Sequence, residues 1–131
     1  SKDGLTPFEK GPTLFEPNQR HSALLVRGHT LHIFWTRVGD APERIYASTL
    51  DLRPDWMDWK VSEPVEVLRA SRPWEGSELP PTPSLRSAIN LAVNQIRDPA
   101  IFQENGRIYL LYAVKGEQGI GIAELTLPAG G

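Results

Sequence analysis

The chain has 131 residues, of which 40% are apolar, and this length and composition predict one globular domain. Its formal net charge is −2 and its basic residues are spread along the chain, so we expect neither a nucleic acid nor a membrane partner. Cysteine is absent, which excludes disulfides and thiolate metal sites. No apolar run is long enough to span a bilayer, so we expect a soluble protein and leave its compartment open.

The first half of the chain predicts a meander of short strands. An apolar strand is expected over 23–26, and the following segment, 30–36 (TLHIFWT), is rich in β-branched and aromatic residues. A third strand is expected over 45–52. The segment 59–68 alternates Val and Glu, and its Pro64 restricts it to an edge strand or a bulge.

A long connection, about 69–96, separates the two halves of the chain. Its first part contains four prolines and is expected to be irregular. Its second part, 84–96, has apolar residues at helical spacing behind Ser84, so either a short helix or coil is consistent with the pattern. A connection of this length in a compact β domain is usually functional or a linker.

The second half repeats the first at an offset of 77 positions, which places Arg97 on Arg20. Strands are therefore expected over 100–103, 107–114 and 120–127, and the apolar segment 12–16 is a candidate eighth strand. After a two-residue gap the match continues to the end of the third strand. The matching apolar pairs are Ala23/Ala100, Leu24/Ile101, Leu31/Ile108, Ile33/Leu110, Phe34/Leu111, Trp35/Tyr112, Ile45/Ile120, Ala47/Ile122 and Leu50/Leu125.

A fixed-offset repeat of short strands predicts an all-β fold of the β-propeller type, built from four-stranded antiparallel blades. The chain holds about two blade equivalents in one domain, residues 1–131. Blade one covers about 20–68, the insertion about 69–96 and blade two about 97–127. A Greek-key sandwich is the alternative, although it does not require the same strand and turn pattern to recur.

Two blades cannot close a ring, and an open arc leaves sheet flanks unprotected. The chain is therefore expected either to belong to a longer propeller or to assemble with copies of itself. A homotrimer with six blades is favoured, and a dimer with four comes next. In such an assembly the strand 12–16 of a neighbour would complete the last blade.

The segment Arg97-Asp98-Pro99-Ala100-Ile101-Phe102, followed by 106–112 (GRIYLLY), resembles the blade start of five-bladed β-propeller glycoside hydrolases of families 43, 32 and 68. The resemblance covers about residues 12–127. It implies inner-strand carboxylates around one sugar, with an acid, a base or nucleophile, and a third supporting group. Asp98 corresponds to the supporting carboxylate, with Arg97 beside it.

The chain departs from that pattern in ways that leave enzymatic activity open. The first repeat has His21-Ser22 where the second has Asp98-Pro99, and no segment resembles the nucleophile motif of families 32 and 68. Glu75, in the insertion, is a second candidate catalytic carboxylate. Asp98 is either a cavity carboxylate or a turn-capping residue. The candidate substrate-binding residues are Arg97, His21 and Trp74.

The function expected from these features is a carbohydrate-active or carbohydrate-binding propeller module with a polar central cavity. The alternative is a non-catalytic oligomerisation module that assembles into a closed propeller. No cofactor or metal is expected, because His29 and His32 point to different faces of a turn and strand.

Overall fold

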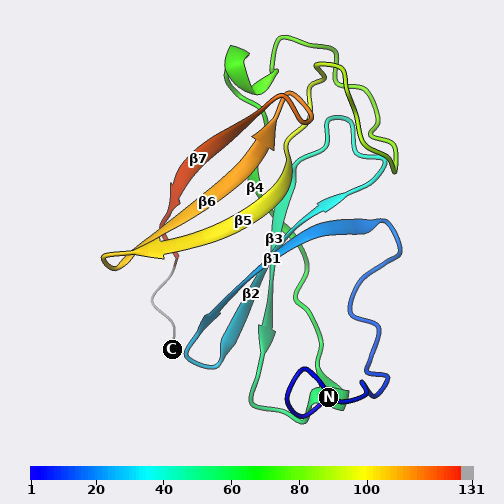
Figure 1. Ribbon diagram of the computed structural model, residues 1–131, viewed down its shortest axis with the longest axis vertical. Helices are drawn as coiled ribbons and strands as arrows, with labels where there is room; N and C mark the ends of the chain where they lie inside the picture. Colours follow the sequence, from blue (N-terminus) through cyan, green and yellow to red (C-terminus); the bar gives the residue numbers. More distant parts are fainter. Residues whose placement is uncertain (128–131) are drawn as a thin grey trace.

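The computed structural model describes residues 1–127 and confirms an all-β chain built from two antiparallel sheets (Figure 1). Sheet A contains, in order, β1 (Gln19–Arg27), β2 (Thr30–Arg37), β3 (Ile45–Asp51) and β4 (Val65–Leu68). Sheet B contains β5 (Arg97–Glu104), β6 (Arg107–Val114) and β7 (Gly119–Leu125). Two short 3-10 helices, η1 (Trp56–Asp58) and η2 (Pro73–Glu75), lie in the connections.

The three strands of sheet B repeat the pairing of the first three strands of sheet A. Ala23 pairs with Phe34 in sheet A, and the equivalent Ala100 pairs with Leu111 in sheet B. The first strand of each sheet, β1 or β5, also has a bulge at the same place, directly after its first arginine. The two units therefore share backbone irregularities as well as sequence.

Local sequence explains how the strands end and which strand lies at an edge. Asn105 and Gly106 both have positive φ, as expected for the two-residue hairpin between β5 and β6. The expected fourth strand, 59–68, is interrupted before Pro64 and forms β4 only from Val65. Because proline cannot donate to a ladder, β4 begins only after Pro64, and it lies at the edge of sheet A, as predicted.

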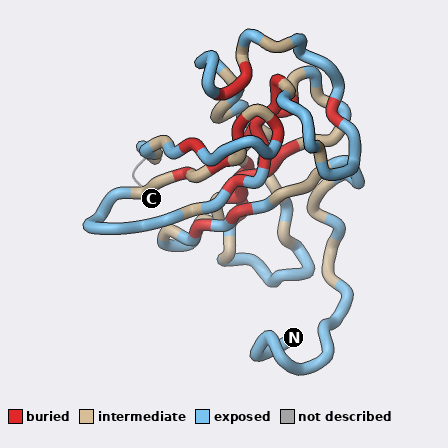
Figure 2. The backbone as a smooth tube through the Cα atoms, turned by 45° about the horizontal axis from the view of Figure 1, so that its top comes forward, coloured by how far each residue is buried: buried red, intermediate tan, exposed pale blue. Residues whose placement is uncertain are grey.

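Each sheet has two faces. In sheet A, face X carries Ala23 and Phe34 and face Y carries Leu24 and Ile33, and the faces of sheet B take the letters of their repeat equivalents. Face X of sheet A packs against face Y of sheet B, and this contact forms the main core. Buried residues are concentrated in the middle of the molecule, away from the exposed N-terminal segment (Figure 2). Face X of sheet A contributes Ala23, Leu25, Phe34, Ile45 and Ala47. Face Y of sheet B contributes Ile101, Ile108, Leu110, Tyr112 and Leu125.

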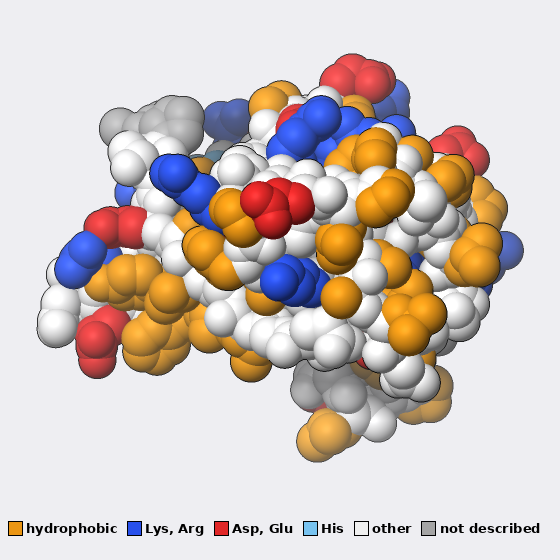
Figure 3. All heavy atoms as spheres, turned by 90° about the horizontal axis from the view of Figure 1, so that it is seen from above, with side chains coloured by type: hydrophobic (Ala, Val, Ile, Leu, Met, Phe, Trp, Pro, Cys, Tyr) orange, Lys and Arg blue, Asp and Glu red, His pale blue; other side chains and the backbone are white. Residues whose placement is uncertain are grey.

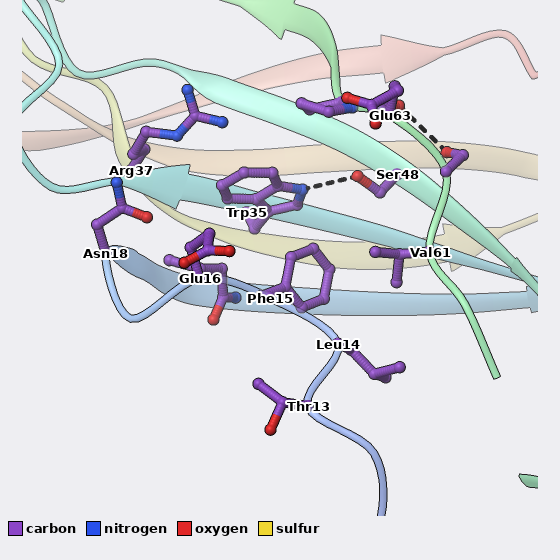
Figure 4. A pocket seen from close by; sticks show the side chains of 13 residues that line it. Thr13, Leu14, Phe15, Glu16, Asn18, Trp35, Arg37, Ser48, Val61 and Glu63 are labelled. Atoms are coloured by element: carbon purple, nitrogen blue, oxygen red, sulfur yellow. Dashed lines mark hydrogen bonds between the residues drawn. The ribbon is translucent and has the colours of Figure 1, made fainter. Parts of the chain in front are cut away.

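Face Y of sheet A forms a second, smaller core with the N-terminal segment. It contributes Ile33, Trp35 and Leu50, and Leu14 and Phe15 pack against them. The rings of Phe15 and Trp35 meet edge to face with centroids 5.2 Å apart (Figure 4). The segment 12–16 forms no strand, contrary to the eighth strand expected there, because its apolar side chains cover the sheet face and its backbone joins no ladder.

The connection 69–96 closes over one end of both sheets. Between residues 84 and 96 it is coil, and several of its backbone groups bond to the loops of the sheets. Ser84 N–H donates to the Asp40 carbonyl (3.1 Å), and Ile96 N–H donates to the Glu43 carbonyl (3.0 Å). Figure 3, which views the molecule from above, shows hydrophobic side chains mixed with charged ones.

Candidate functional site

Strands β1 and β5 begin with the same backbone irregularity, and it carries the candidate residues His21 and Asp98. His21 in β1 and Asp98 in β5 occupy equivalent positions in the two bulges, with φ of 52° and 49°. Non-glycine residues seldom adopt this left-handed conformation, although Asp and His do so more often than most. Strained backbone conformations cluster at functional sites, so this matched pair is the candidate functional site.

The two bulges bring His21 and Asp98 together, although they are far apart in the chain. His21 Nε2 lies 3.3 Å from Asp98 Oδ1, and His21 Nδ1 lies 3.0 Å from the Thr36 hydroxyl. The side chains are 25% and 48% exposed, respectively. The sequence-predicted residues His21 and Asp98 thus form one polar pair that solvent reaches.

A buried carboxylate, Glu43, lies beneath this pair and joins the two repeats. It is 0% exposed and lies in the loop between β2 and β3. Arg20 donates to it through both Nε (2.9 Å) and Nη2 (2.5 Å), a bidentate geometry. Arg97 Nε, from the second repeat, lies 3.4 Å from the same carboxylate.

Arg97 is buried and fully engaged by protein groups. It donates to the Gln95 side-chain oxygen (3.0 Å), to the Ser87 carbonyl (3.3 Å) and to Glu117 (2.9 Å). The pair Arg97–Glu117 in repeat two is thus similar to Arg20–Glu43 in repeat one, although the repeat equivalent of Glu43 is Gln118 and Glu117 is partly exposed. Arg97 therefore positions the start of β5, and its contacts do not support the direct ligand contact expected from the sequence.

Burial and charge set the protonation of this cluster. Burial alone would raise the pKa of Glu43, but the hydrogen bonds from Arg20 hold it below its ordinary value. Burial lowers the pKa of His21 below its ordinary value, although the Asp98 carboxylate acts in the opposite direction. At neutral pH, His21 is therefore a neutral imidazole that can donate one hydrogen bond and accept another.

Glu75, the other candidate catalytic carboxylate, is buried away from this pair. It accepts hydrogen bonds from the backbone N–H of Ser71 (2.8 Å) and Arg72 (2.9 Å) and from the Tyr112 hydroxyl (2.9 Å). Burial alone would raise the pKa of Glu75, but the Ser71 N–H and the other donors hold it below its ordinary value. These contacts anchor η2 to β6 and do not support a catalytic role.

The hollow next to Asp98 opens on face X of sheet B. It has a volume of about 540 Å³, and its lining includes Asp98, Glu117, Gln118 and Ile120. Trp74 is 52% exposed in η2 and does not line this hollow. The structure therefore places Asp98 at an open cavity and leaves Trp74 on a separate part of the surface.

The sequence patterns did not predict Glu43 and Glu117 as site residues. Both lie in the turn that precedes the third strand of their repeat, and each pairs with the first arginine of that repeat. The available signal was the repeated arginine, since a buried guanidinium needs a carboxylate partner. Sequence alone could not choose that partner among the acidic residues of the chain.

Replacing Tyr112 by Phe is expected to lower the free energy of unfolding by about 1.5–3 kcal/mol, since it removes a hydrogen bond to a buried charged acceptor. Burial, with a contribution from Glu75, raises the pKa of Tyr112 to about 12, so the hydroxyl remains a donor at neutral pH. Urea denaturation measures the change. Tyr109→Phe, in the same strand on the opposite face, is the matched control, and an equal loss in both variants would contradict this role.

Acid is expected to destabilise the protein progressively below neutral pH. His21 has a folded-state pKa below 6.5, so as pH falls through that value the unfolded state takes up the proton first. Glu43 and Glu75 have folded-state pKa values below 4.5, so the stability they contribute is present above pH 4.5 and is lost as pH falls further. A pH series of urea midpoints should fall gently below pH 6.5 and steeply below 4.5. A flat series down to pH 4 would contradict these directions.

The fold and the polar pair define a class: an all-β protein of two repeated antiparallel sheets, with matched residues near the start of the first strand of each sheet. No family model and no solved structure matches the chain. The uncharacterized protein R118 of Acanthamoeba polyphaga mimivirus is 38% identical over 141 aligned residues, which cover 95% of this chain and 40% of that protein. The chain thus spans about two fifths of the length of this relative. Within residues 1–127, no helix is long and apolar enough to cross a membrane.

Proposed function

We propose that the chain supplies two adjacent blades of a β-propeller and that the His21–Asp98 pair contributes to a carbohydrate-binding site. The observation that carries the proposal is the matched pair of left-handed bulges, which presents an imidazole and a carboxylate side by side at one end of both inner strands. The resemblance of the segment that starts at Arg97 to propeller glycoside hydrolases supports the same ligand class.

The chemistry of the pair suits a neutral polyhydroxylated ligand. The Asp98 carboxylate accepts hydrogen bonds from hydroxyls, and the neutral imidazole of His21 donates or accepts one. The formal net charge of −2 does not favour a polyanion. A sugar is therefore the ligand that these groups fit best, and Asp98 would be a supporting carboxylate in contact with it.

We do not propose that these two blades alone hydrolyse a glycosidic bond. Glycoside hydrolysis needs two carboxyl groups on either side of the scissile bond. In this chain Glu43 and Glu75 are buried and already hydrogen bonded, and Glu117 is paired with Arg97. A catalytic pair would have to include carboxylates from other blades.

The length of the relative supports a longer propeller of about five blades rather than a ring of six or four. Two units occupy 40% of the mimivirus protein, so its whole length has room for about five units of the same size. This number agrees with the five-bladed enzymes that the sequence resembles. A complete ring would place the polar starts of all inner strands around one cavity.

Asp98→Ala is expected to weaken the binding of a neutral oligosaccharide by about tenfold or more, because it removes a charged hydrogen-bond acceptor from the sugar. Calorimetric titration with a panel of neutral sugars measures the dissociation constant. Asp58→Ala, at an exposed carboxylate in η1, is the control and should leave it unchanged. Sugar binding that survives Asp98→Ala at full strength would remove Asp98 from the site.

Oligomeric assembly is the second candidate function, and the exposed apolar face X of sheet B favours it. A homo-oligomeric ring would join this face to face Y of sheet A in the next copy. In sheet A, however, Leu14 and Phe15 already cover that face. We therefore place assembly from copies of this chain second.

A further inference from the structure

Face X of sheet B is apolar and exposed, although the equivalent face of sheet A is the centre of the core. Ile120 in β7 is 78% exposed, whereas its repeat equivalent Ile45 in β3 is 0% exposed. The same contrast holds for Phe102, which is half exposed, and its buried equivalent Leu25. The apolar residues of this face are Ala100, Phe102, Tyr109, Leu111, Ala113, Ile120 and Ile122.

The repeat indicates what kind of surface covers such a face. In the first repeat, face X is covered by face Y of the following repeat, in a head-to-tail arrangement. Because each unit presents one face of each kind, two units joined in this way leave face X of the second unit uncovered. Face X of sheet B therefore corresponds to the face of sheet A against which the next sheet of the chain packs.

In a second copy of the chain, face Y is exposed only along β1, at Leu24 and Val26, and its centre is covered. In sheet A the rings of Phe15 and Trp35 are in contact, and Leu14 packs beside them. The hollow that remains there, about 470 Å³, is bordered by both the N-terminal segment and residues 61–64 (Figure 4). The N-terminal segment occupies the place that face X of a neighbouring copy would need.

We propose that face X of sheet B binds a third repeat of the same type, which presents an uncovered face Y of Leu, Ile and aromatic side chains. The contact continues the established interface between sheets A and B. His21 of the first repeat meets Asp98 of the second, so the equivalent inner-strand residue of the third repeat contacts Asp98 from the other side. The third repeat thereby closes the hollow beside Asp98.

The test uses the absence of native cysteine, which makes a single Ile122→Cys reporter specific. Its rate of reaction with a bulky thiol reagent is measured in the chain alone and in a fusion. In the fusion, a flexible linker as long as the connection 69–96 and a second copy of residues 19–68 follow residue 127. This added copy lacks Leu14 and Phe15, so its face Y is free.

We expect the reporter to react about tenfold more slowly in the fusion. A fusion whose added copy carries Ile33→Glu should restore the fast rate, and a Val26→Cys reporter on sheet A should react equally in all forms. Equal rates for the Ile122→Cys reporter in the chain and in the fusion would overturn the proposal. Protection that appears in the chain alone as its concentration rises would also overturn it, because a second copy would then be the partner. Neither outcome depends on sugar binding.

Discussion

Glu43→Gln is expected to lower the free energy of unfolding by about 3–5 kcal/mol, the largest loss of any single polar substitution considered. The substitution leaves Arg20 and Arg97 close together in the interior without the carboxylate that neutralises them. Glutamine has nearly the same shape, so the effect reports charge and hydrogen bonding and not a cavity. Urea denaturation at pH 7 measures it.

The control for Glu43→Gln is Glu124→Gln, because Glu124 also pairs with an arginine, Arg107, but at the surface. An exposed ion pair contributes at most about 1 kcal/mol. The variant should therefore be nearly as stable as the native chain. Equal losses for the two variants would show that Glu43 does not join the repeats as described.

Ile45→Ala is expected to cost about 2–5 kcal/mol of stability, whereas Ile120→Ala should cost less than about 0.5 kcal/mol. The two isoleucines occupy equivalent positions in the repeat but differ in burial. Ile45 is buried against sheet B, and Ile120 is exposed. The comparison keeps residue type, strand and neighbours as similar as one chain allows. Thermal or urea unfolding of both variants measures the difference.

A large loss for Ile120→Ala would contradict the description of face X as free. Ile122→Ala provides a second measurement on the same strand, because Ile122 corresponds to Ala47 and is also exposed. If both exposed substitutions are neutral while Ile45→Ala is severe, the repeats differ only in what covers them. That result would support the docking face directly.

Much of the strand order could be predicted from the sequence because hydrophobic alternation and turn residues act locally. The hairpin at Asn105 and Gly106 and the start of β4 after Pro64 both depend on properties of single residues. The repeat offset added the equivalence of His21 and Asp98, which the structure shows to be a contact between the two strands.

The errors in the prediction arose where backbone and side-chain partners come from distant parts of the chain. The apolar segment around Phe15 was expected to form a strand, but Phe15 packs on Trp35 and covers a face of sheet A. Ser84 could have capped a helix, yet its hydroxyl oxygen accepts a hydrogen bond from the Gly39 N–H in a distant loop. Glu43 was missed because only the assembled fold brings Arg20 and Arg97 to one carboxylate.

The central claim is that the His21–Asp98 pair contacts a carbohydrate, and the three histidines of the chain allow a direct test. The imidazole NMR signals are followed while the protein is titrated with neutral oligosaccharides. We expect the His21 signals to shift saturably and the signals of His29 and His32 to stay constant. Binding that leaves His21 unmoved, or no binding across the panel, would contradict it.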